Sequence, residues 1–329
     1  MLVDNSDQTA RITYRWRAYA TIAARAVRLG VSPIGLLASK YPYLLPTRDR
    51  PASVSIEFTD ACNLKCDYCL NPRFAYPRTY MNDEVFEAVV ADLAQHPADR
   101  VRVCGGEPTL HPSFARFAAS LAPHTKFLSV VTNGQWRNPE VADVLLQWFD
   151  LIEVSVDAGG PEQYEEARAG ASFGLLRSNL ELLRRRRAET GSDAAINIRL
   201  MIRPSTNSDE DSERELWTEF GDSVMLQYII DQRADGTSTD VFVPIQLQQR
   251  AIPRCTMPFK DLAIRSDGSV PVCHVNGTSL DPGERIILGN VLTSALHDMW
   301  SNATMTAVRS AHRSRDASAL KFCRGCSGR

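Results

Sequence analysis

Residues 62–69, which decide the fold, read Cys-Asn-Leu-Lys-Cys-Asp-Tyr-Cys. The cysteines Cys62, Cys66 and Cys69 are separated by three and then two residues, and they follow a strand-like run at 53–59. Three thiolates on one short loop suit a cubane [4Fe–4S] cluster whose fourth iron is left for a ligand from outside the protein. A structural zinc knuckle is the alternative, although zinc sites usually close with a second pair of ligands.

With the aromatic residue Tyr68 just before its last cysteine, this motif resembles the hallmark of the radical S-adenosylmethionine (SAM) superfamily. The resemblance implies that Cys62, Cys66 and Cys69 hold a [4Fe–4S] cluster and that the open iron binds SAM. It further implies that electron transfer cleaves SAM to a 5′-deoxyadenosyl radical, with flavodoxin or ferredoxin as the type of reductant.

The composition fits a globular enzyme. The chain has 329 residues, of which 44% are hydrophobic and 23% charged, and its formal net charge is −2. Near-neutral charge gives no field that would recruit nucleic acid. The apolar runs are shorter than the roughly 20 residues of a membrane span, and residues 1–9 show no signal-peptide core. Eight cysteines without a secretory signal indicate a reducing compartment, so we expect a cytoplasmic protein that uses cysteines to bind metal.

From residue 51, predicted strands alternate with predicted helices. The strands are expected at 53–59, 100–104, 126–132, 151–157, 195–203 and 223–230, and the helices at 81–95, 111–121, 138–148, 161–186 and 208–219. Alternation of this kind implies parallel strands and right-handed crossovers. The pattern therefore predicts an α/β fold, a partial (β/α)6 barrel of the TIM type with its site at the carboxyl ends of the strands, as the resemblance also implies.

Three regions are expected along the chain. Residues 1–50 form an N-terminal helical extension. Its arginine-rich helices at 11–40 lie on a membrane surface, near an anionic substrate or, as is more common, against the barrel with solvated charges. Residues 51–231 form the barrel. A polar linker opens the last region, 232–329, which we expect to be a small domain with a second metal site.

Strand alternation predicts which side chains face the barrel lumen. Valines occupy one face of the run 101–107, and apolar residues occupy one face of 151–157, so the other face of each run points inward. The inward set is Glu57, Thr59, Arg102, Cys104, Asn133, Glu153, Ser155, Asp157, Asn197, Arg199, Met201 and Arg203. A structural barrel would be filled by branched apolar side chains, so this polar set favours a ligand site.

Three segments at strand ends resemble SAM-binding positions of the superfamily. Gly-Gly-Glu-Pro at 105–108 resembles the segment that binds the SAM amino group, while 132–134 and 155–157 resemble segments near the ribose and carboxylate. Arg199 pairs either with the SAM carboxylate or with Glu153. The positions implied to contact the cofactor are Tyr68, Gly105, Gly106, Glu107, Asn133, Ser155 and Arg199.

A second cysteine set follows the linker. Cys255, Cys273, Cys323 and Cys326 can close a tetrahedral site for zinc or for an iron–sulfur cluster, and a hairpin is expected at 264–272. The spacing, together with the Gly-Asn-Val at 289–291, resembles the SPASM/twitch extension of radical SAM enzymes in its single-cluster form. That resemblance implies an auxiliary [4Fe–4S] cluster bound by all four cysteines.

The spacing also resembles that of dehydrogenases and epimerases that act on aminocyclitols and aminoglycosides in antibiotic biosynthesis. It implies a small sugar-like substrate that loses a hydrogen atom from a carbinol carbon. A radical enzyme acting on a ribosomal peptide is less favoured, because the fifty-residue lead-in is too short for a leader-binding domain. A zinc-binding scaffold without catalysis is the third alternative.

Cys104 decides between two outcomes of such a reaction. A free cysteine at a strand end is most often a small buried apolar residue. In the lumen, however, its weak S–H bond would quench a substrate radical, which suits an epimerase and harms a dehydrogenase. We therefore predict epimerisation with Cys104 as hydrogen donor and with Glu153, Asp157 and Arg203 as substrate contacts, and dehydrogenation is the alternative.

Overall fold

A computed structural model describes residues 42–44, 46–69, 71, 78–157, 160–202, 210–228, 255–277, 283, 285–315, 320 and 323. The helices expected at 11–40, the linker at 231–240, and the side chains of Arg203 and Cys326 lie outside these residues. The chain divides into two compact units, Met1–Thr47 and Arg48–Arg329. In the first unit the described part contains the short 3-10 turn η1 (Pro42–Leu44). The second unit is described below by itself.

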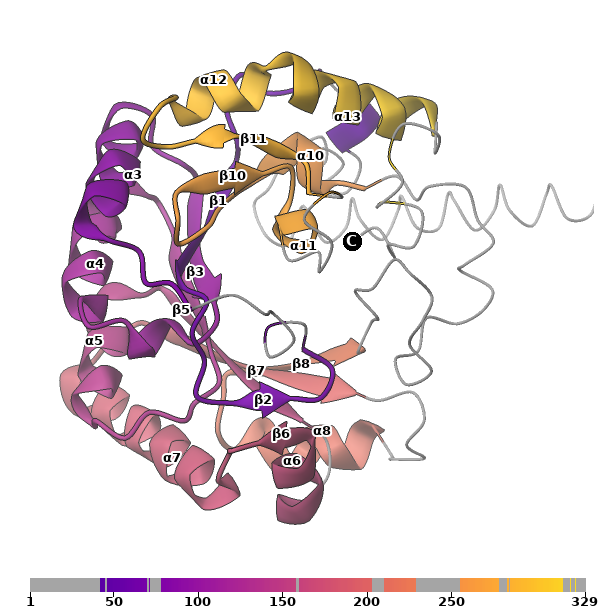
Figure 1. The fold of residues 1–329 in the computed structure, drawn as a ribbon. Helices are drawn as coiled ribbons and strands as arrows, with labels where there is room; N and C mark the ends of the chain where they lie inside the picture. The colour runs from indigo at the N-terminus through magenta and orange to yellow at the C-terminus, as the bar shows by residue number, and fades with distance from the viewer. Residues whose placement is uncertain are drawn as a thin grey trace, which may run out of the picture. The chain divides into compact units, whose positions relative to one another are not determined.

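A curved parallel sheet forms the centre of this unit (Figure 1). Its strands are β1 (Ser53–Thr59), β3 (Arg100–Gly105), β4 (Leu128–Thr132), β5 (Leu151–Asp157), β7 (Ala195–Ile202), β8 (Ser223–Tyr228) and β9 (Asp261–Ile264). They are ordered β8-β7-β5-β4-β3-β1-β9, and every neighbouring pair is parallel. The expected partial barrel with six strand positions is therefore confirmed, and β9 adds a seventh strand that the sequence did not indicate.

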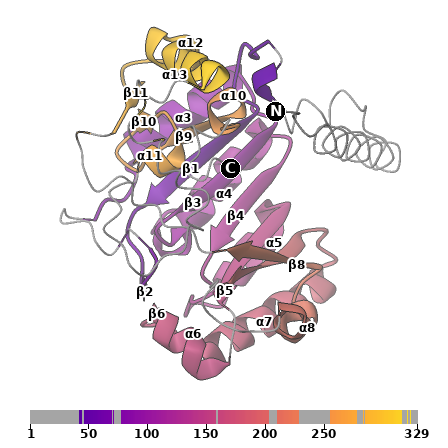
Figure 2. The same ribbon diagram turned by 90° about the vertical axis from the view of Figure 1, so that its right-hand side faces the viewer.

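Helices cover the outer face of the sheet, as Figures 1 and 2 show. They are α3 (Asp83–Gln95), α4 (Phe114–Leu121), α5 (Glu140–Trp148), α7 (Phe173–Thr190) and α8 (Glu210–Thr218). Asn82 begins α3 by accepting a hydrogen bond from the Val85 N–H, and Asp83 and Glu84 complement the helix dipole. The bounds of α3, α4, α5 and α8 agree to within three residues with the helices predicted at 81–95, 111–121, 138–148 and 208–219.

The core lies between these helices and the outward face of the strands. Ile56, Phe58 and Val103 are fully buried beneath α3 and α4, where the rings of Phe86 and Phe117 stack with their centroids 3.6 Å apart. Each large apolar side chain buried in this way contributes about 1.5–3 kcal/mol of transfer free energy. Because the apolar residues of each strand pack into this core, the residues that alternate with them face the lumen.

The single helix predicted at 161–186 is wrong. The chain instead forms α6 (Pro161–Ala167), the short strand β6 (Arg168–Ala169) and then α7. Gly170 has a φ of +95°, a conformation that cannot continue a right-handed helix, and the Ser172 side chain caps the new helix by accepting from the Leu175 N–H. The break allows β6 to pair antiparallel with β2 (Lys65–Cys66) inside the cysteine loop (Figure 1).

The C-terminal region is joined to the barrel through the backbone. The hairpin predicted at 264–272 forms a turn, in which the Arg265 N–H donates to the Ser269 carbonyl, but its two strands belong to different sheets. β9 pairs with β1, and β10 (Ser269–Pro271) pairs with β11 (Ile287–Asn290). The remaining elements are the 3-10 turns η3 (Pro108–Leu110) and η4 (Ala122–His124) and the helices α10 (Met257–Lys260), α11 (His274–Gly277), α12 (Leu296–Ser301) and α13 (Ala303–Ser314). Within the described part of the chain, every helix is too short or too polar to cross a bilayer.

Candidate functional site

The loop with the first three cysteines leaves the carboxyl end of β1 and is held there by backbone hydrogen bonds. The Gly106 N–H donates to the Thr59 carbonyl (2.8 Å), and the Glu107 N–H donates to the Ala61 carbonyl (2.7 Å). Within the loop the Cys69 N–H donates to the Cys66 carbonyl (3.1 Å). The end of β3 therefore fixes the start of the cysteine loop.

Gly105 and Gly106 are required by this contact. Gly105 has a φ of +125°, and a Cβ on Gly106 would lie 2.0 Å from the Ala61 carbonyl oxygen. A Cβ on Gly105 would lie 2.6 Å from both the Glu57 Cγ and the Thr59 carbonyl oxygen of β1, whereas a Cβ on Gly106 would point into the backbone of the cysteine loop.

The Glu107 side chain is buried and receives four hydrogen bonds. Its Oε1 accepts from the Thr109 N–H (3.2 Å), the Thr109 hydroxyl (2.7 Å) and the Thr132 hydroxyl (2.8 Å), and its Oε2 accepts from the Asn133 N–H (2.7 Å). Burial raises the pKa of Glu107 and these donors oppose the rise. The carboxylate thus ties β3 to β4, and the predicted SAM contact stays a prediction for the backbone of this segment.

Asn133 brings the end of β4 to the first cysteine. Its Nδ2 donates to the Asn63 Oδ1 (2.8 Å) and lies 3.7 Å from the Cys62 Sγ, which also accepts from the Leu64 N–H (3.4 Å). Burial raises the pKa of the Cys62 thiol to about 11, while these two donors lower it. N–H groups aimed at a buried sulfur stabilise a thiolate, the form that binds iron, so this donor set fits an iron–sulfur cluster.

Tyr68, Asp157 and Arg168 form a buried set beneath the loop. Arg168 Nε lies 2.5 Å from Asp157 Oδ2, with both side chains at most 5% exposed, and the Tyr68 hydroxyl lies 3.2 Å from Asp157 Oδ1. Burial raises the pKa of Cys66 to about 12, and the Arg168 charge opposes that rise. Asp157 was predicted as a substrate contact; the structure shows Arg168 and Tyr68 at its carboxylate, and the substrate contact stays a prediction.

Arg168 was missed by the sequence reasoning. It lies within the stretch predicted as one long helix, and that prediction gives its side chain no part in the site. A signal was present in the Arg-Ala-Gly at 168–170, because a glycine after an arginine often ends a helix.

The predicted inward residues of β3, β5 and β7 do meet in the lumen. Arg102 Nη2 lies 3.3 Å from Glu153 Oε2, and Arg199 Nε lies 3.2 Å from Glu153 Oε1. Arg199 therefore contacts Glu153, and its contact with the SAM carboxylate stays a prediction. Ser155 is half-buried and lies beside Arg199 in the strand register, while Ser223 donates to Asn197 (2.8 Å).

Cys104 lies among these lumen charges. It is aligned with Glu57 across β1 and β3, and its pKa is raised to about 11 chiefly by burial, with Arg102 the strongest opposing charge. Glu57 in turn accepts from the Ser266 N–H (3.2 Å) and hydroxyl (3.0 Å) at the end of β9. Cys104 is therefore a protonated thiol at neutral pH, one residue before Gly105.

The second cysteine set is described in part. Cys255 precedes α10, Cys273 precedes α11 and accepts from the Asn276 N–H (3.3 Å), and Cys323 follows the described chain at Leu320. All three are half-buried and form no disulfide bond among the described residues, and Cys326 lies outside those residues. Among the described residues, no three His, Cys, Asp or Glu side chains surround one metal position.

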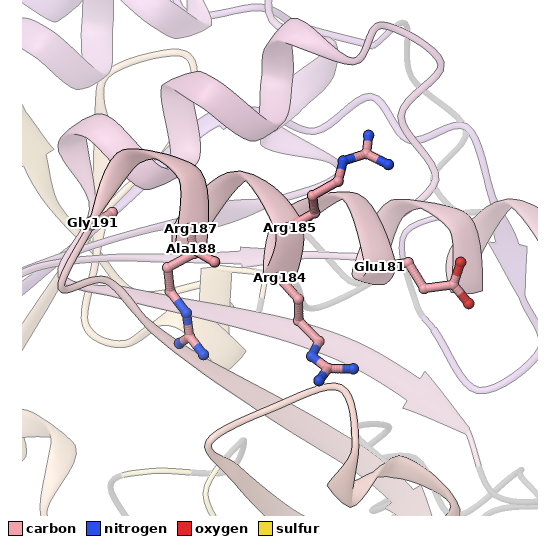
Figure 3. A pocket seen from close by; sticks show the side chains of 7 residues that line it. Glu181, Arg184, Arg185, Arg187, Ala188 and Gly191 are labelled. Atoms are coloured by element: carbon pink, nitrogen blue, oxygen red, sulfur yellow. The ribbon is translucent and has the colours of Figure 1, made fainter.

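A shallow surface depression lies elsewhere, on the outer side of α7 (Figure 3). It is lined by Glu181, Arg184, Arg185, Arg187, Ala188, Gly191 and Ser192. Arg187 is paired with Asp222 (2.5 Å), and Arg185 lies 3.7 Å from Glu189. This depression contains none of the predicted site residues.

Comparison with protein families gives two matches. Residues 56–212 match the radical SAM superfamily, and residues 255–327 match SPASM, an iron–sulfur cluster-binding domain. Among curated proteins, GTP 3′,8-cyclase of Vibrio parahaemolyticus is 29% identical over 153 residues, which are 44% of this chain and 45% of that protein. Mycofactocin maturase MftC of Mycobacterium ulcerans is 30% identical over 153 residues, 46% of this chain and 40% of that protein. The matched part of the chain spans about half the length of these relatives.

Several solved structures share the fold. Streptococcus suis SuiB bound to the precursor peptide SuiA has a TM-score of 0.64 at 12% identity and covers 98% of this chain and 84% of its own. anSMEcpe with bound AdoMet has a TM-score of 0.63 at 18% identity, and the alignment covers 84% of this chain and 89% of that chain. BtrN in complex with AdoMet and 2-DOIA has a TM-score of 0.54 at 15% identity, and the alignment covers 84% of this chain and 92% of that chain.

These matches agree with the site. The cofactors are a [4Fe–4S] cluster that binds SAM and an auxiliary iron–sulfur cluster, so the zinc-scaffold alternative is wrong. The matched ranges contain both cysteine sets, and the sheet is the partial barrel that the first motif predicted. The chain belongs to the radical SAM superfamily and carries a C-terminal SPASM domain.

Proposed function

We propose that this protein removes a hydrogen atom from a carbinol carbon of a small sugar-like substrate in the barrel lumen and returns one to the opposite face, inverting that carbon. The observation that supports this proposal is Cys104, a protonated thiol that lies among polar side chains one residue before the end of β3. A thiol in this position is suited to donate a hydrogen atom to a substrate radical.

The residues that would hold the cofactors follow from the geometry. Cys62, Cys66 and Cys69 would bind the first cluster, with Asn133 donating toward Cys62. Cys255, Cys273, Cys323 and Cys326 would bind the auxiliary cluster. Bound SAM and its cluster supply the carbon radical that abstracts the substrate hydrogen. Tyr68, Ser155 and the backbone at 105–107 are candidate SAM contacts, since each lies at or near the carboxyl end of a strand or on the cysteine loop.

Cys104 has one task in this scheme. Its S–H bond breaks as a C–H bond forms on the substrate, which leaves a sulfur radical. One electron and one proton restore the thiol, and a reductant of the flavodoxin or ferredoxin class would supply the electron. Glu153 would act on the substrate through the two arginines that it holds. A substrate contact by Arg203 stays a prediction, because its side chain lies outside the described residues.

A second candidate function is supported by the similarities to known proteins. SuiB is bound to a precursor peptide, MftC is named a maturase, and BtrN is bound to 2-DOIA. These likenesses favour oxidation of a small alcohol or modification of a peptide over epimerisation. In either case Cys104 would be a packing residue, because a nearby hydrogen donor would quench the radical before it could lose an electron.

Turnover in D2O separates the candidates. The reconstituted enzyme is incubated anaerobically with SAM, reductant and a panel of aminocyclitols and aminoglycosides, and the products are analysed by mass. Epimerisation through an exchangeable thiol adds one deuterium at the inverted carbon, whereas oxidation removes two hydrogens. An undeuterated ketone, or a deuterated epimer formed at the normal rate by Cys104→Ala, would contradict the proposed role of Cys104.

A further inference from the structure

The two short strands β2 and β6 bring one arginine next to the first cysteine set (Figure 1). Their antiparallel register places Cys66 opposite Arg168 and Lys65 opposite Ala169. Residues directly opposite each other in such a pair point to the same face, with their Cβ atoms about 5 Å apart. Lys65 and Ala169 are exposed, whereas Cys66 is half-buried and Arg168 is buried. Cys66 and Arg168 therefore share the inward face of this pair of strands.

The Arg168 guanidinium is held at one edge and between two aromatic rings. Its Nε donates to Asp157 Oδ2 at 2.5 Å, and Asp157 also accepts from the Tyr68 hydroxyl (3.2 Å). The guanidinium carbon lies 5.9 Å from the Tyr68 ring centroid and 5.8 Å from that of Tyr164, within the range of cation–π attraction. These contacts fix the position of the guanidinium without using its Nη groups.

The Nη groups of Arg168 lack acceptors in the protein. A guanidinium has five N–H donors, and among the described residues only the Nε donor of Arg168 makes a hydrogen bond. The side chain is 4% exposed. The fully enclosed side-chain nitrogens without a hydrogen bond in the described chain do not include Nη1 or Nη2 of Arg168, so both border open space. A buried cation with unused donors is costly unless an acceptor reaches them.

A cluster bound by Cys66 would supply sulfur acceptors on the same face. Burial raises the pKa of Cys66, and the largest opposing influence is the positive charge of Arg168, which exceeds the influence of the negative charge of Asp157. The ion pair thus leaves a net positive influence at Cys66. Nearby charge and hydrogen bonds to the sulfurs are among the factors that set the reduction potential of an iron–sulfur cluster.

We propose that the Nη groups of Arg168 donate to sulfur of the first cluster beside Cys66, and that this contact raises the reduction potential of the cluster. One electron from a reductant of the flavodoxin or ferredoxin class makes the cluster more negative, so N–H donors stabilise the reduced form more than the oxidised form. Asp157 is a positioning residue, because it holds Nε and leaves both Nη groups for the cluster. This inference rests on the part of the proposed function that assigns Cys62, Cys66 and Cys69 to the first cluster, and it is independent of epimerisation.

Bound SAM is the rival acceptor, because it binds the open iron of the same cluster. Its carboxylate would also suit a guanidinium. A contact of that kind would act only when SAM is present, so the experiment compares samples with and without SAM.

The test is a redox titration of the reconstituted holoenzyme, followed by electron paramagnetic resonance, with and without saturating SAM and without substrate. The cluster that binds SAM is identified by the change in its spectrum when SAM is added. Arg168→Met should make reduction of that cluster about tenfold less favourable in both conditions, which lowers its potential by about 59 mV for one electron. The auxiliary cluster should keep its potential.

Three further variants separate a contact with the cluster from a purely structural role. Arg168→Lys keeps the charge but loses the planar fork, so its potential should fall by less, and it decides the test if the methionine variant does not fold. Asp157→Asn removes a negative charge and can still accept from Nε, so it should raise the potential. Arg184→Met is the matched control, since Arg184 is exposed on α7 (Figure 3) and should leave the potential unchanged.

The inference is overturned if both Arg168 variants keep the wild-type potential or if the shift appears only with SAM. It is also overturned if Arg168→Met and Asp157→Asn shift the potential in the same direction, because a loosened site would admit water in both variants. A wild-type chain without a SAM-responsive cluster would refute the cysteine assignment of the proposed function together with this inference. A SAM-responsive cluster whose potential ignores Arg168 would refute this inference alone.

Discussion

Two buried carboxylates, Glu107 at the barrel rim and Glu153 in the barrel lumen, differ in the groups that surround them. Glu107 receives four hydrogen bonds from neutral donors and holds two loops together. Glu153 faces two arginines, and one of them has a donor without a partner among the described residues. A carboxylate saturated by neutral donors joins two loops, whereas a carboxylate between two arginines fixes the positions of both guanidinium groups.

The largest effect is expected at the rim, where the chemistry begins. Replacing Cys62, Cys66 and Cys69 by alanine should abolish 5′-deoxyadenosine formation and leave about four irons per chain, those of the auxiliary cluster. Iron analysis measures the iron content per chain, and chromatography of the nucleoside products measures 5′-deoxyadenosine formation. Arg102→Met in the barrel lumen is the variant for comparison, and it should keep SAM cleavage. Cleavage by the triple variant would show that other residues hold the cluster.

The next effect concerns the buried pair beneath the cysteine loop. Arg168→Met leaves Asp157 buried without its cation, which should cost roughly 3–5 kcal/mol of unfolding free energy. Denaturant titration measures this, with the exposed Arg184→Met as a control that should change stability by less than about 0.5 kcal/mol. Equal stability of the two variants would mean that water replaces the guanidinium.

A direct comparison of the two carboxylates gives a smaller effect. Glu107→Gln places an amide N–H against donors and should cost roughly 1–3 kcal/mol, together with part of the bound iron. Glu153→Gln removes a charge beside two arginines that are partly exposed, so we expect a smaller loss of stability. If Glu153→Gln were the more destabilising change, the contacts of Glu153 with Arg102 and Arg199 would be the more important for stability, which would contradict the contrast between the two carboxylates.

The smallest effect is expected at the outer surface, where Arg187 pairs with Asp222 (2.5 Å). Hydrogen bonds from Arg187 lower the pKa of Asp222 in the folded state. The pair therefore stabilises the fold above the unfolded pKa of about 4, and this stabilisation is lost as the pH falls through the lower folded value. Asp222→Asn should cost less than about 1 kcal/mol at pH 7 and nothing at the lowest pH at which the protein stays folded. A loss independent of pH would show that the carboxylate charge is irrelevant.

Local patterns predicted much of this architecture. The bounds of β1 and β5 agree with the prediction, because apolar residues alternate cleanly along both strands and a cysteine loop or a turn follows. The same alternation placed Arg102, Glu153 and Arg199 on one face, and the ion pairs confirm it.

The errors have a common cause, which is contact between segments far apart in sequence. The break at Arg168 depends on pairing with Lys65 and Cys66, about a hundred residues earlier. β9 was taken for half of a hairpin because nothing local shows that β1 has a free edge for it. The ion pair of Asp157 was not predicted because its partner, Arg168, lies inside the predicted helix.

The most direct test of the account is substrate-free SAM cleavage in D2O, because it asks whether the Cys104 thiol lies within reach of the radical. Exchange converts Cys104 to S–D, and without substrate the radical takes an atom from the nearest weak bond. We predict that wild-type enzyme forms mainly singly deuterated 5′-deoxyadenosine, and that Cys104→Ser, which keeps the size of the side chain, forms mainly undeuterated product in the same amount. An equal deuterium content in the two proteins would contradict the account.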